Sequence, residues 1–322
     1  MKRIHWLVPY KVKEPKDISL SNIASIRLRT ALFNLPFFNE YKLTINESID
    51  DLDKIDYLFI SKFPGNREDL ITNWLNIIDN HRKNSKKIFF DYTDHHLDKE
   101  TITGQFYRAS LNQHDQIITS SEKLKSHLSS NFKNITVIED PIEIEIQKVK
   151  KSKESSFLFF GHHTNLKYLF NLINNWNYKI QSNLIIQTSE EGINVIRNQS
   201  QHISKPPNLN IQFQLWSIEN MLKVSNNVSG VIIPGDINDK TKNGVSHNRL
   251  ITAFALGLPV AATKYESYLE FDNQFVDIDN KNEFENFLQD ASQYSSRVKM
   301  AQKKIKSYTK ENIVKKWLDL IQ

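Results

Sequence analysis

The sequence predicts an α/β protein of two domains, each built on a parallel sheet that helices cover. Three observations support this prediction. Short apolar segments typical of buried strands alternate with helical patterns. The alternation starts again after a basic, serine-containing segment at residues 147–156. Finally, 322 residues are more than one hydrophobic core usually holds. Strands that alternate with helices form parallel sheets, so each half predicts a sheet of its own.

The first half contains five apolar segments that end in turn residues or polar loops. Helical patterns follow several of them, at residues 23–35, at 70–78 and around Leu124 and Leu128. The five strands are expected at residues 4–8, 56–61, 87–91, 116–120 and 135–138.

The second half repeats this organisation and then ends in an amphipathic helix. The final helix is expected at residues 312–321, where apolar side chains recur on one face opposite lysines and an aspartate. The stripe consists of Ile313, Val314, Trp317, Leu318 and Ile321. The strands of this half are expected at residues 157–160, 183–187, 209–213, 228–234 and 258–262.

The composition limits the classes of function. Hydrophobic residues make up 39% of the chain and charged residues 25%, as in soluble globular proteins. The chain has no cysteine, which excludes disulfides, thiolate catalysis and cysteine-ligated metals. We see neither a secretory signal pattern nor an apolar run of about 20 residues, and we expect a cytoplasmic protein with at most peripheral contact at the inner membrane face. The net charge of +5 favours anionic partners, which include nucleotides, acidic lipid surfaces and nucleic acid.

Residues 243–263 form the most informative segment, a polar loop followed by a short helix, a glycine and a strand. Ser246 or His247 can cap the helix, and Gly257 suits a left-handed stop. The free N–H groups of the helix start, beside Asn248 and Arg249, suit an anion. Arg249 could instead be an ordinary surface arginine, but a helix start is an unfavourable place for a cation, which favours an anionic ligand.

A second strand-to-helix turn lies at Gly161, where the backbone can approach a ligand closely. A single glycine is weak evidence, because any tight turn can require one. His162, His163 and Asn165 add polar groups at the carboxyl end of the strand, where open α/β sheets bind ligands.

Acidic and imidazole side chains gather after the strand at residues 87–91. Asp91, Asp94, His95 and His96 could move protons, bind substrate hydroxyls or hold a metal, or the histidines could simply be exposed in a loop. Adjacent histidines rarely ligate one ion together, so a metal is the less favoured use.

The first helix carries two arginines, Arg27 and Arg29, which taken alone are most often solvated. Three motifs are absent: Gly-x-Gly-x-x-Gly, the Walker lysine loop and the Gly-x-Ser-x-Gly elbow. Their absence argues against dinucleotide oxidoreductases, nucleoside triphosphatases and hydrolases of the corresponding families.

Taken in order, these segments resemble the GT-B glycosyltransferases of the glycosyl-transferases-group-1 type over nearly the whole chain. The specific segment is 246–260, a helix start with Asn248-Arg249 followed by Leu-Gly-Leu-Pro-Val. The others gain weight from their order, and they lie at residues 25–29, 90–94, 115–124, 137–142 and the Phe159-Phe160-Gly161 turn followed by Asn165.

The resemblance implies two Rossmann-like domains whose parallel sheets face a central cleft. It implies an N-terminal acceptor domain at residues 1–146, a linker at 147–156 and a nucleotide-sugar domain at 157–305. The helix at residues 306–322 is expected to cross back and pack on the first domain. The implied reaction moves a hexosyl group, with retention, from a UDP- or GDP-sugar to a glycan or lipid-linked acceptor.

The resemblance also assigns roles to residues. It implies no metal and no cofactor beyond the nucleotide sugar, because helix dipole and basic side chains stabilise the departing diphosphate. Arg27 and Arg29 are expected near the acceptor or a phosphate. Asp94, His95 and His96 are the expected catalytic residues. The expected donor-binding residues are Gly161, His162, Asn165, Ser246, Asn248, Arg249 and Thr252.

One departure keeps other functions open. Many relatives have two glutamates eight positions apart, where this chain has Gly244 and Thr252. An altered donor site is the interpretation we favour, in line with a subset of the family that carries Asn-Arg. The alternatives are a non-catalytic GT-B scaffold or sugar-nucleotide sensor, a glycosyltransferase that acts on nucleic acid, and a nucleotide-sugar epimerase.

Overall fold

The computed structural model describes residues 1–322 except 22, 153, 200–202 and 204–205. The chain forms two compact units. Unit 1 consists of Met1–Pro141, Gly244–Ser246 and Tyr308–Gln322. Unit 2 consists of Ile142–Asn243 and His247–Ser307.

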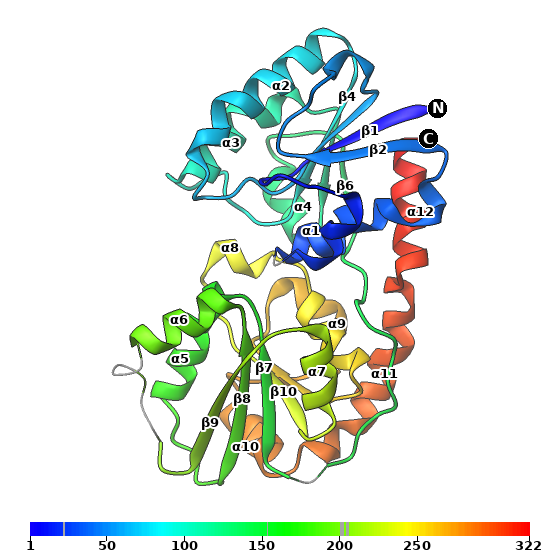
Figure 1. The fold of residues 1–322 in the computed structure, drawn as a ribbon. Coiled ribbons are helices and arrows are strands. Elements are labelled where there is room, and N and C mark those ends of the chain that lie inside the picture. Colours follow the sequence, from blue (N-terminus) through cyan, green and yellow to red (C-terminus); the bar gives the residue numbers. More distant parts are fainter. Residues whose placement is uncertain (22, 153, 200–202, 204–205) are drawn as a thin grey trace. The chain divides into compact units, whose positions relative to one another are not determined.

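Unit 1 is built on a six-stranded sheet in the order β2-β1-β3-β4-β5-β6, in which the neighbouring strands are parallel (Figure 1). The central strand β3 is buried along its whole length, as expected for a parallel sheet covered on both faces. The strands are β1 (Lys2–Leu7), β2 (Tyr41–Asn46), β3 (Tyr57–Ile60), β4 (Lys87–Tyr92), β5 (Gln116–Thr119) and β6 (Ile135–Val137).

Helices cover both faces of this sheet. Side chains of α2, α3 and α4 form one core with Leu7, Leu58 and Ile60. On the other face, α12 brings Trp317 against Trp6, with ring centroids 5.8 Å apart, and against Phe59, 6.0 Å apart. The α-helices of unit 1 are α1 (Ala24–Leu28), α2 (Ile71–Lys83), α3 (Ile102–Ser110), α4 (Glu122–Leu128) and α12 (Lys310–Ile321). Its 3₁₀ turns are Pro15–Leu20, Thr30–Asn34, Pro36–Phe38, Leu52–Lys54, Glu68–Leu70 and Leu111–Gln113, and Lys306–Tyr308 precedes α12.

Unit 2 contains a second six-stranded sheet, in the order β12-β11-β10-β7-β8-β9, again with parallel neighbours. Strand β7 is central and buried throughout, which places its carboxyl end in the middle of the sheet edge. The strands are β7 (Ser156–Phe160), β8 (Ser182–Thr188), β9 (Leu209–Leu215), β10 (Gly230–Ile233), β11 (Val260–Ala262) and β12 (Val276–Asp277).

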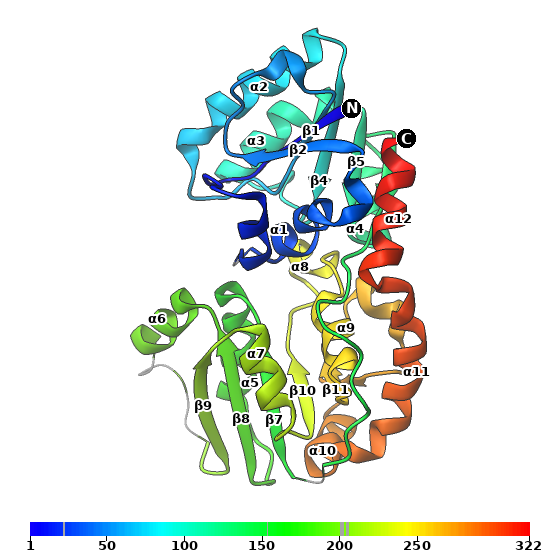
Figure 2. The same cartoon turned by 45° about the vertical axis from the view of Figure 1, so that its right-hand side comes forward.

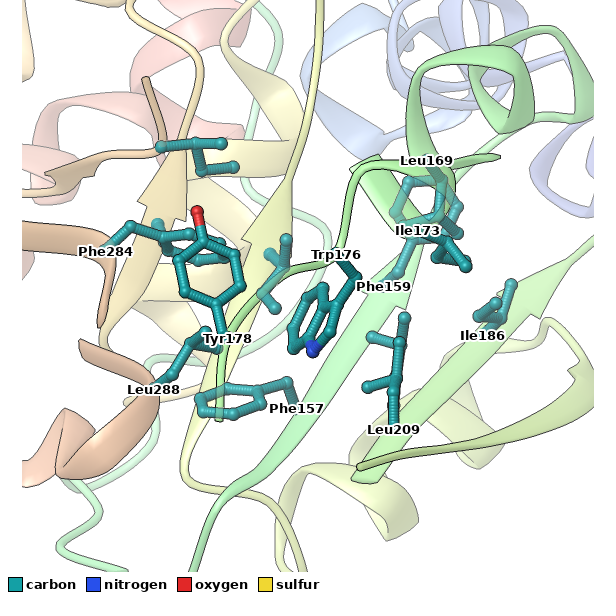
Figure 3. Packing of buried hydrophobic residues seen from close by; sticks show 14 of the residues in the cluster. Phe157, Phe159, Leu169, Ile173, Trp176, Tyr178, Ile186, Leu209, Phe284 and Leu288 are labelled. Carbon is teal, nitrogen blue, oxygen red and sulfur yellow. The ribbon is translucent and has the colours of Figure 1, made fainter. Parts of the chain in front are cut away.

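On one face of the sheet, the core of unit 2 combines aliphatic and aromatic side chains. Phe157 and Phe159 of β7 pack there with Trp176, Tyr178 and Phe284 (Figure 3). Helix α7 contacts β7, while α9 contacts β10 and β11 and is packed in turn against α11 (Figure 2). The α-helices are α5 (Leu166–Asn174), α6 (Glu190–Gln199), α7 (Ile218–Ser225), α8 (Lys240–Asn243), α9 (Asn248–Ala255), α10 (Lys281–Gln289) and α11 (Ser295–Ile305). Its 3₁₀ turns are η7 (His163–Asn165), η8 (Glu266–Phe271) and η9 (Ala291–Tyr294).

The two parallel sheets confirm the predicted α/β class. Each of the ten expected strands has a counterpart, while β2 and β12 were not expected. The predicted helix at residues 23–35 is broken into α1 and the 3₁₀ turn Thr30–Asn34. Among the described residues, no helix combines the length and the apolar character needed to cross a bilayer.

Two backbone hydrogen bonds join the segment expected to be a linker to unit 2. Gln147 N donates to Ala255 O at 2.7 Å, and Lys150 N donates to Gly257 O at 2.8 Å. The first bond satisfies a carbonyl that the end of α9 leaves free, and the second involves the glycine that follows the helix. The Lys150 side chain is half-buried, and burial lowers its pKa to about 8. Lys153, which falls within the expected linker, lies outside the described residues.

Candidate functional site

The first part of the candidate site is the turn that follows β7. Gly161 N donates to Gln187 O of β8 at 3.1 Å, so the turn remains tied to the sheet. A Cβ added at Gly161 would lie 3.5 Å from both Arg249 Nη1 and Asn165 Nδ2. Gly161 is not among the glycines with positive φ, and a Cβ at this position would make ordinary van der Waals contacts, so neither the backbone conformation nor steric crowding requires a glycine here.

The second part is α9, whose start confirms the helix predicted from the sequence. His247 is its N-cap residue, and Gly257, with φ +76°, follows its end. Leu250, Ile251 and Phe254 are buried and fix the helix on the sheet. A rigid element therefore holds Arg249, in the first turn, beside Gly161.

Two other arginines of the chain are paired with carboxylates, whereas Arg249 is not paired with one among the described residues. Arg67 and Arg297 form ion pairs with Glu47 and Glu283, at 3.1 and 2.8 Å. Arg249 forms no ion pair with a carboxylate among the described residues, and its buried Nη1 has no hydrogen-bond partner there. A partly buried cation without a counter-ion, at a helix start, is the arrangement that an anionic ligand would complete.

The structure brings some of the other expected donor residues to this place. Asn165 is buried at the end of η7, and His162 is exposed in the turn, where its ring centroid lies 4.0 Å from that of His163. Asn248 is the first residue of α9, and Thr252 is buried one turn further on. Ser246 is grouped with unit 1 and not with these residues.

A second polar cluster follows β4 in unit 1 and contains the expected catalytic residues. The Tyr92 hydroxyl accepts the backbone N–H of His96 at 2.9 Å and lies 3.2 Å from His95 Nδ1. His95 Nε2 lies 3.0 Å from Asp98 Oδ2. If the Tyr92 O–H donates to Nδ1, the ring proton of His95 is on Nε2 and is donated to Asp98. Burial raises the pKa of Tyr92 to about 12, which keeps this hydroxyl protonated.

Two members of this cluster were missed by the sequence reasoning. Lys62 pairs with Asp94, and Asp98 is the carboxylate that lies against His95. Lys62 lies just after β3, as Asp94 lies just after β4, so a search of all strand ends would have found it. Among the described residues, no group of three or more histidine, aspartate or glutamate side chains is arranged to hold a metal ion.

The two arginines of the first helix do not share one environment. Arg29 is fully buried, where its guanidinium pairs with Asp91 at 2.7 Å and with Asp140 at 3.1 Å. A side chain that is closed off from solvent and already paired twice does not reach an acceptor or a phosphate, so that expectation needs correction. The two buried carboxylates offset part of the cost of burying the guanidinium. Arg27 is partly exposed and donates to Ser21 O at 2.7 Å.

Comparisons with known proteins identify the fold. No family model matches the chain, and no curated protein matches it. A solved α-glucosyltransferase in complex with UDP and a 13-mer DNA containing an HMU base is similar over 100% of this chain and 99% of its own, with a TM-score of 0.67 and 12% identity. The lipopolysaccharide outer core galactosyltransferase WaaB, in its apo form, is similar over 100% and 99%, with a TM-score of 0.57 and 12% identity.

A trehalose-6-phosphate synthase is also similar, over 82% of this chain and 72% of its own, with a TM-score of 0.56 and 11% identity. At such low identity the likeness concerns the fold. The chain has the α/β fold of the GT-B glycosyltransferases, with two six-stranded parallel sheets.

Proposed function

We propose that the protein is a glycosyltransferase that moves a sugar from a nucleoside-diphosphate sugar to an acceptor. The observation that carries the proposal is Arg249, a guanidinium without a carboxylate partner among the described residues, which lies next to Gly161 and at the start of α9. The GT-B fold supports it, because the similar solved structures are glycosyltransferases and one of them is in complex with UDP.

The chemistry of the transfer explains why such an arginine is useful. The bond between the anomeric carbon and the phosphate oxygen breaks, and its electron pair remains on the diphosphate. The acceptor oxygen forms the new bond to the anomeric carbon and gives up its proton. Arg249 and the N–H groups at the start of α9 stabilise the negative charge that grows on the leaving group. We therefore propose that the transfer needs no metal ion, and that turnover persists in EDTA.

Unit 1 supplies the groups that we assign to the acceptor side. The His95–Asp98 pair and the Lys62–Asp94 pair follow two neighbouring strands, β4 and β3. His95 is held by Tyr92 and Asp98, as suits a residue that contacts a hydroxyl or takes part in proton transfer. We propose a hexosyl group, transfer with retention, and a glycan or lipid-linked acceptor.

A second candidate is transfer to nucleic acid. The net charge of +5 favours a polyanion, and one similar solved enzyme is in complex with DNA. Turnover of the donor, measured with duplex DNA in one arm and a lipid-linked glycan in the other, separates the two acceptors.

The variant Arg249→Ala tests the proposal. We expect its affinity for UDP or GDP to fall at least about tenfold, because a hydrogen-bonded charge pair with the diphosphate is lost. Calorimetric titration measures the affinity, and thermal unfolding checks that the fold is intact. Arg197→Ala is the matched control, since it removes the same charge from an exposed position on α6 of the same unit. Equal nucleotide affinity in wild type and Arg249→Ala would contradict the assignment.

A further inference from the structure

The edge strands of the two sheets are β2, β6, β9 and β12. Three of them have features that discourage pairing with a strand of another chain: β2 carries the exposed Lys42, β6 has three residues and β12 has two. Charged side chains and very short strands are common means of protecting a sheet edge. Strand β9 has neither feature.

Strand β9 is a long and uncharged edge. It spans seven residues, Leu209–Leu215, and residues 206–218 contain no charged side chain, although charged residues make up 25% of the chain. Among the described residues, β8 is its one neighbouring strand, and β9 lies at the margin of the sheet in Figure 2. Such an edge is a template to which a further strand can be added.

The bonds between β9 and β8 show which backbone groups point to the open edge. Trp216 N donates to Thr188 O at 2.8 Å, and Ser182 N donates to Asn208 O at 2.9 Å. The even-numbered residues of this segment therefore direct their N–H and C=O groups toward β8. Because these groups alternate along a strand, the odd-numbered residues direct theirs to the open side.

Some of the outward groups already have partners. Leu209 N donates to Pro206 O at 3.0 Å, and Leu215 O accepts a side-chain bond from α7 at 3.1 Å. Among the described residues, the N–H and C=O groups of Ile211 and Phe213 form no bond on this side. The middle of the edge is thus available for pairing.

On one face of β9 the side chains are apolar and remain partly exposed. Leu209 and Ile211 pack against the core of unit 2. Alternation along the strand puts Phe213 and Leu215 on the same face, where they are 43% and 55% exposed. The described part of unit 2 therefore leaves apolar surface beside the open edge.

The other face of β9 carries amides, two of which pair across strands. Asn210 Nδ2 donates to Asn183 Oδ1 of β8, and Gln187 Nε2 of β8 donates to Gln214 Oε1, both at 3.2 Å. Gln212 lies between Asn210 and Gln214 on this face and is exposed. A strand added at this edge would meet apolar side chains on one face and amides on the other.

We propose that β9 pairs antiparallel with β9 of a second copy of this chain, about a two-fold axis at Gln212. The axis places Ile211 of each copy opposite Phe213 of the other, and each of these two pairs exchanges two N–H···O bonds. Leu209 and Leu215 meet on the same apolar face. The backbone groups that lack a partner in one copy are therefore the groups that the second copy supplies.

The same axis also matches the amide face. Asn210 lies opposite Gln214 of the second copy, which continues the rows of amides that start on β8. Gln212 meets its own copy, and β9 brings no charge into the pairing. Because apolar side chains meet apolar ones and amides meet amides, the strand is its own complement, which favours a second copy over an unrelated chain. Self-association through β9 goes beyond the proposed transfer and does not depend on it.

Charges placed at Gln212 test this pairing. In Gln212→Lys and in Gln212→Glu two like charges face each other across the axis, at a residue that is exposed within one copy. Sedimentation velocity of the full chain, from about 1 to about 200 µM, covers the dissociation constants expected of a small interface. We expect a reversible dimer for wild type and a dissociation constant at least about tenfold higher for each variant alone. Mixing the two variants in equal amounts should restore the dimer, because opposite charges then meet.

Gln289→Lys is the matched control, because it adds the same charge at an exposed residue of α10 in the same unit. It should dimerise like wild type, and unchanged midpoints of thermal unfolding show that all three variants fold. The proposal is overturned if wild type stays monomeric over the whole concentration range. It is also overturned if either Gln212 variant alone dimerises like wild type, or if their mixture stays monomeric.

Discussion

The buried ion network of Arg29 allows a stability prediction with a defined magnitude. Arg29→Met keeps much of the side-chain volume but leaves Asp91 and Asp140 without their cation. The arginine side chain is 0% exposed, and those of the two aspartates are 1% and 5% exposed. Removing one partner of a buried ion pair typically lowers the free energy of unfolding by about 3–5 kcal/mol, and here one arginine is paired with two carboxylates. We expect a loss in that range in the free energy of unfolding, measured by urea titration with tryptophan fluorescence.

The exposed pair of Arg82 and Asp115 provides the control. Its side chains are 48% and 36% exposed, so Arg82→Met should cost less than about 1 kcal/mol. Burial already raises the pKa of Asp91, and Arg29 opposes that rise. In Arg29→Met the folded-state pKa of Asp91 rises further, so the stability deficit should grow as pH rises above about 4. A loss no larger than that of Arg82→Met would refute this reasoning.

Two further predictions concern stability. Burial lowers the pKa of His5 and of His81 to about 4 from 6.5, so the unfolded chain binds more protons between these values. Stability is then lost as pH falls through that window, by at most about 3 kcal/mol for each histidine. In urea titrations, the free energy of unfolding of His5→Leu should depend less steeply on pH than that of wild type. Gly257→Ala should lower the free energy of unfolding by about 2 kcal/mol or more, because φ is +76° and a Cβ would lie 2.2 Å from Lys148 O. Gly65→Ala is the control. A Cβ at Gly65 has no contact closer than 3.6 Å, so this variant should change the unfolding midpoint little.

The sequence pattern was a good guide where side-chain periodicity and turn residues decide the structure. The start of α9, the stop at Gly257 and the strand β11 follow one another as expected. Strand β2 was missed although Tyr41, Leu43 and Ile45 alternate with polar residues, so a signal was present. Strand β12 has two residues, which is too short for any periodicity.

The site could be predicted only in part. Arg249 stood out because a cation at a helix start is unfavourable without an anion. The role of Asp98 beside His95 depends on the path of a loop, and the burial of Arg29 depends on Asp140, which is far away in the sequence. Periodicity carries no information on such contacts, because they arise only when distant segments are packed together.

The central claim is that the chain transfers sugar from a nucleoside-diphosphate sugar held by Arg249. The most direct test incubates the full chain with UDP- and GDP-sugars and follows the release of nucleoside diphosphate by phosphorus NMR. We predict slow release from at least one donor, and release at least about tenfold slower with Arg249→Ala. Intact donors throughout, with no binding of any nucleotide, would contradict the claim.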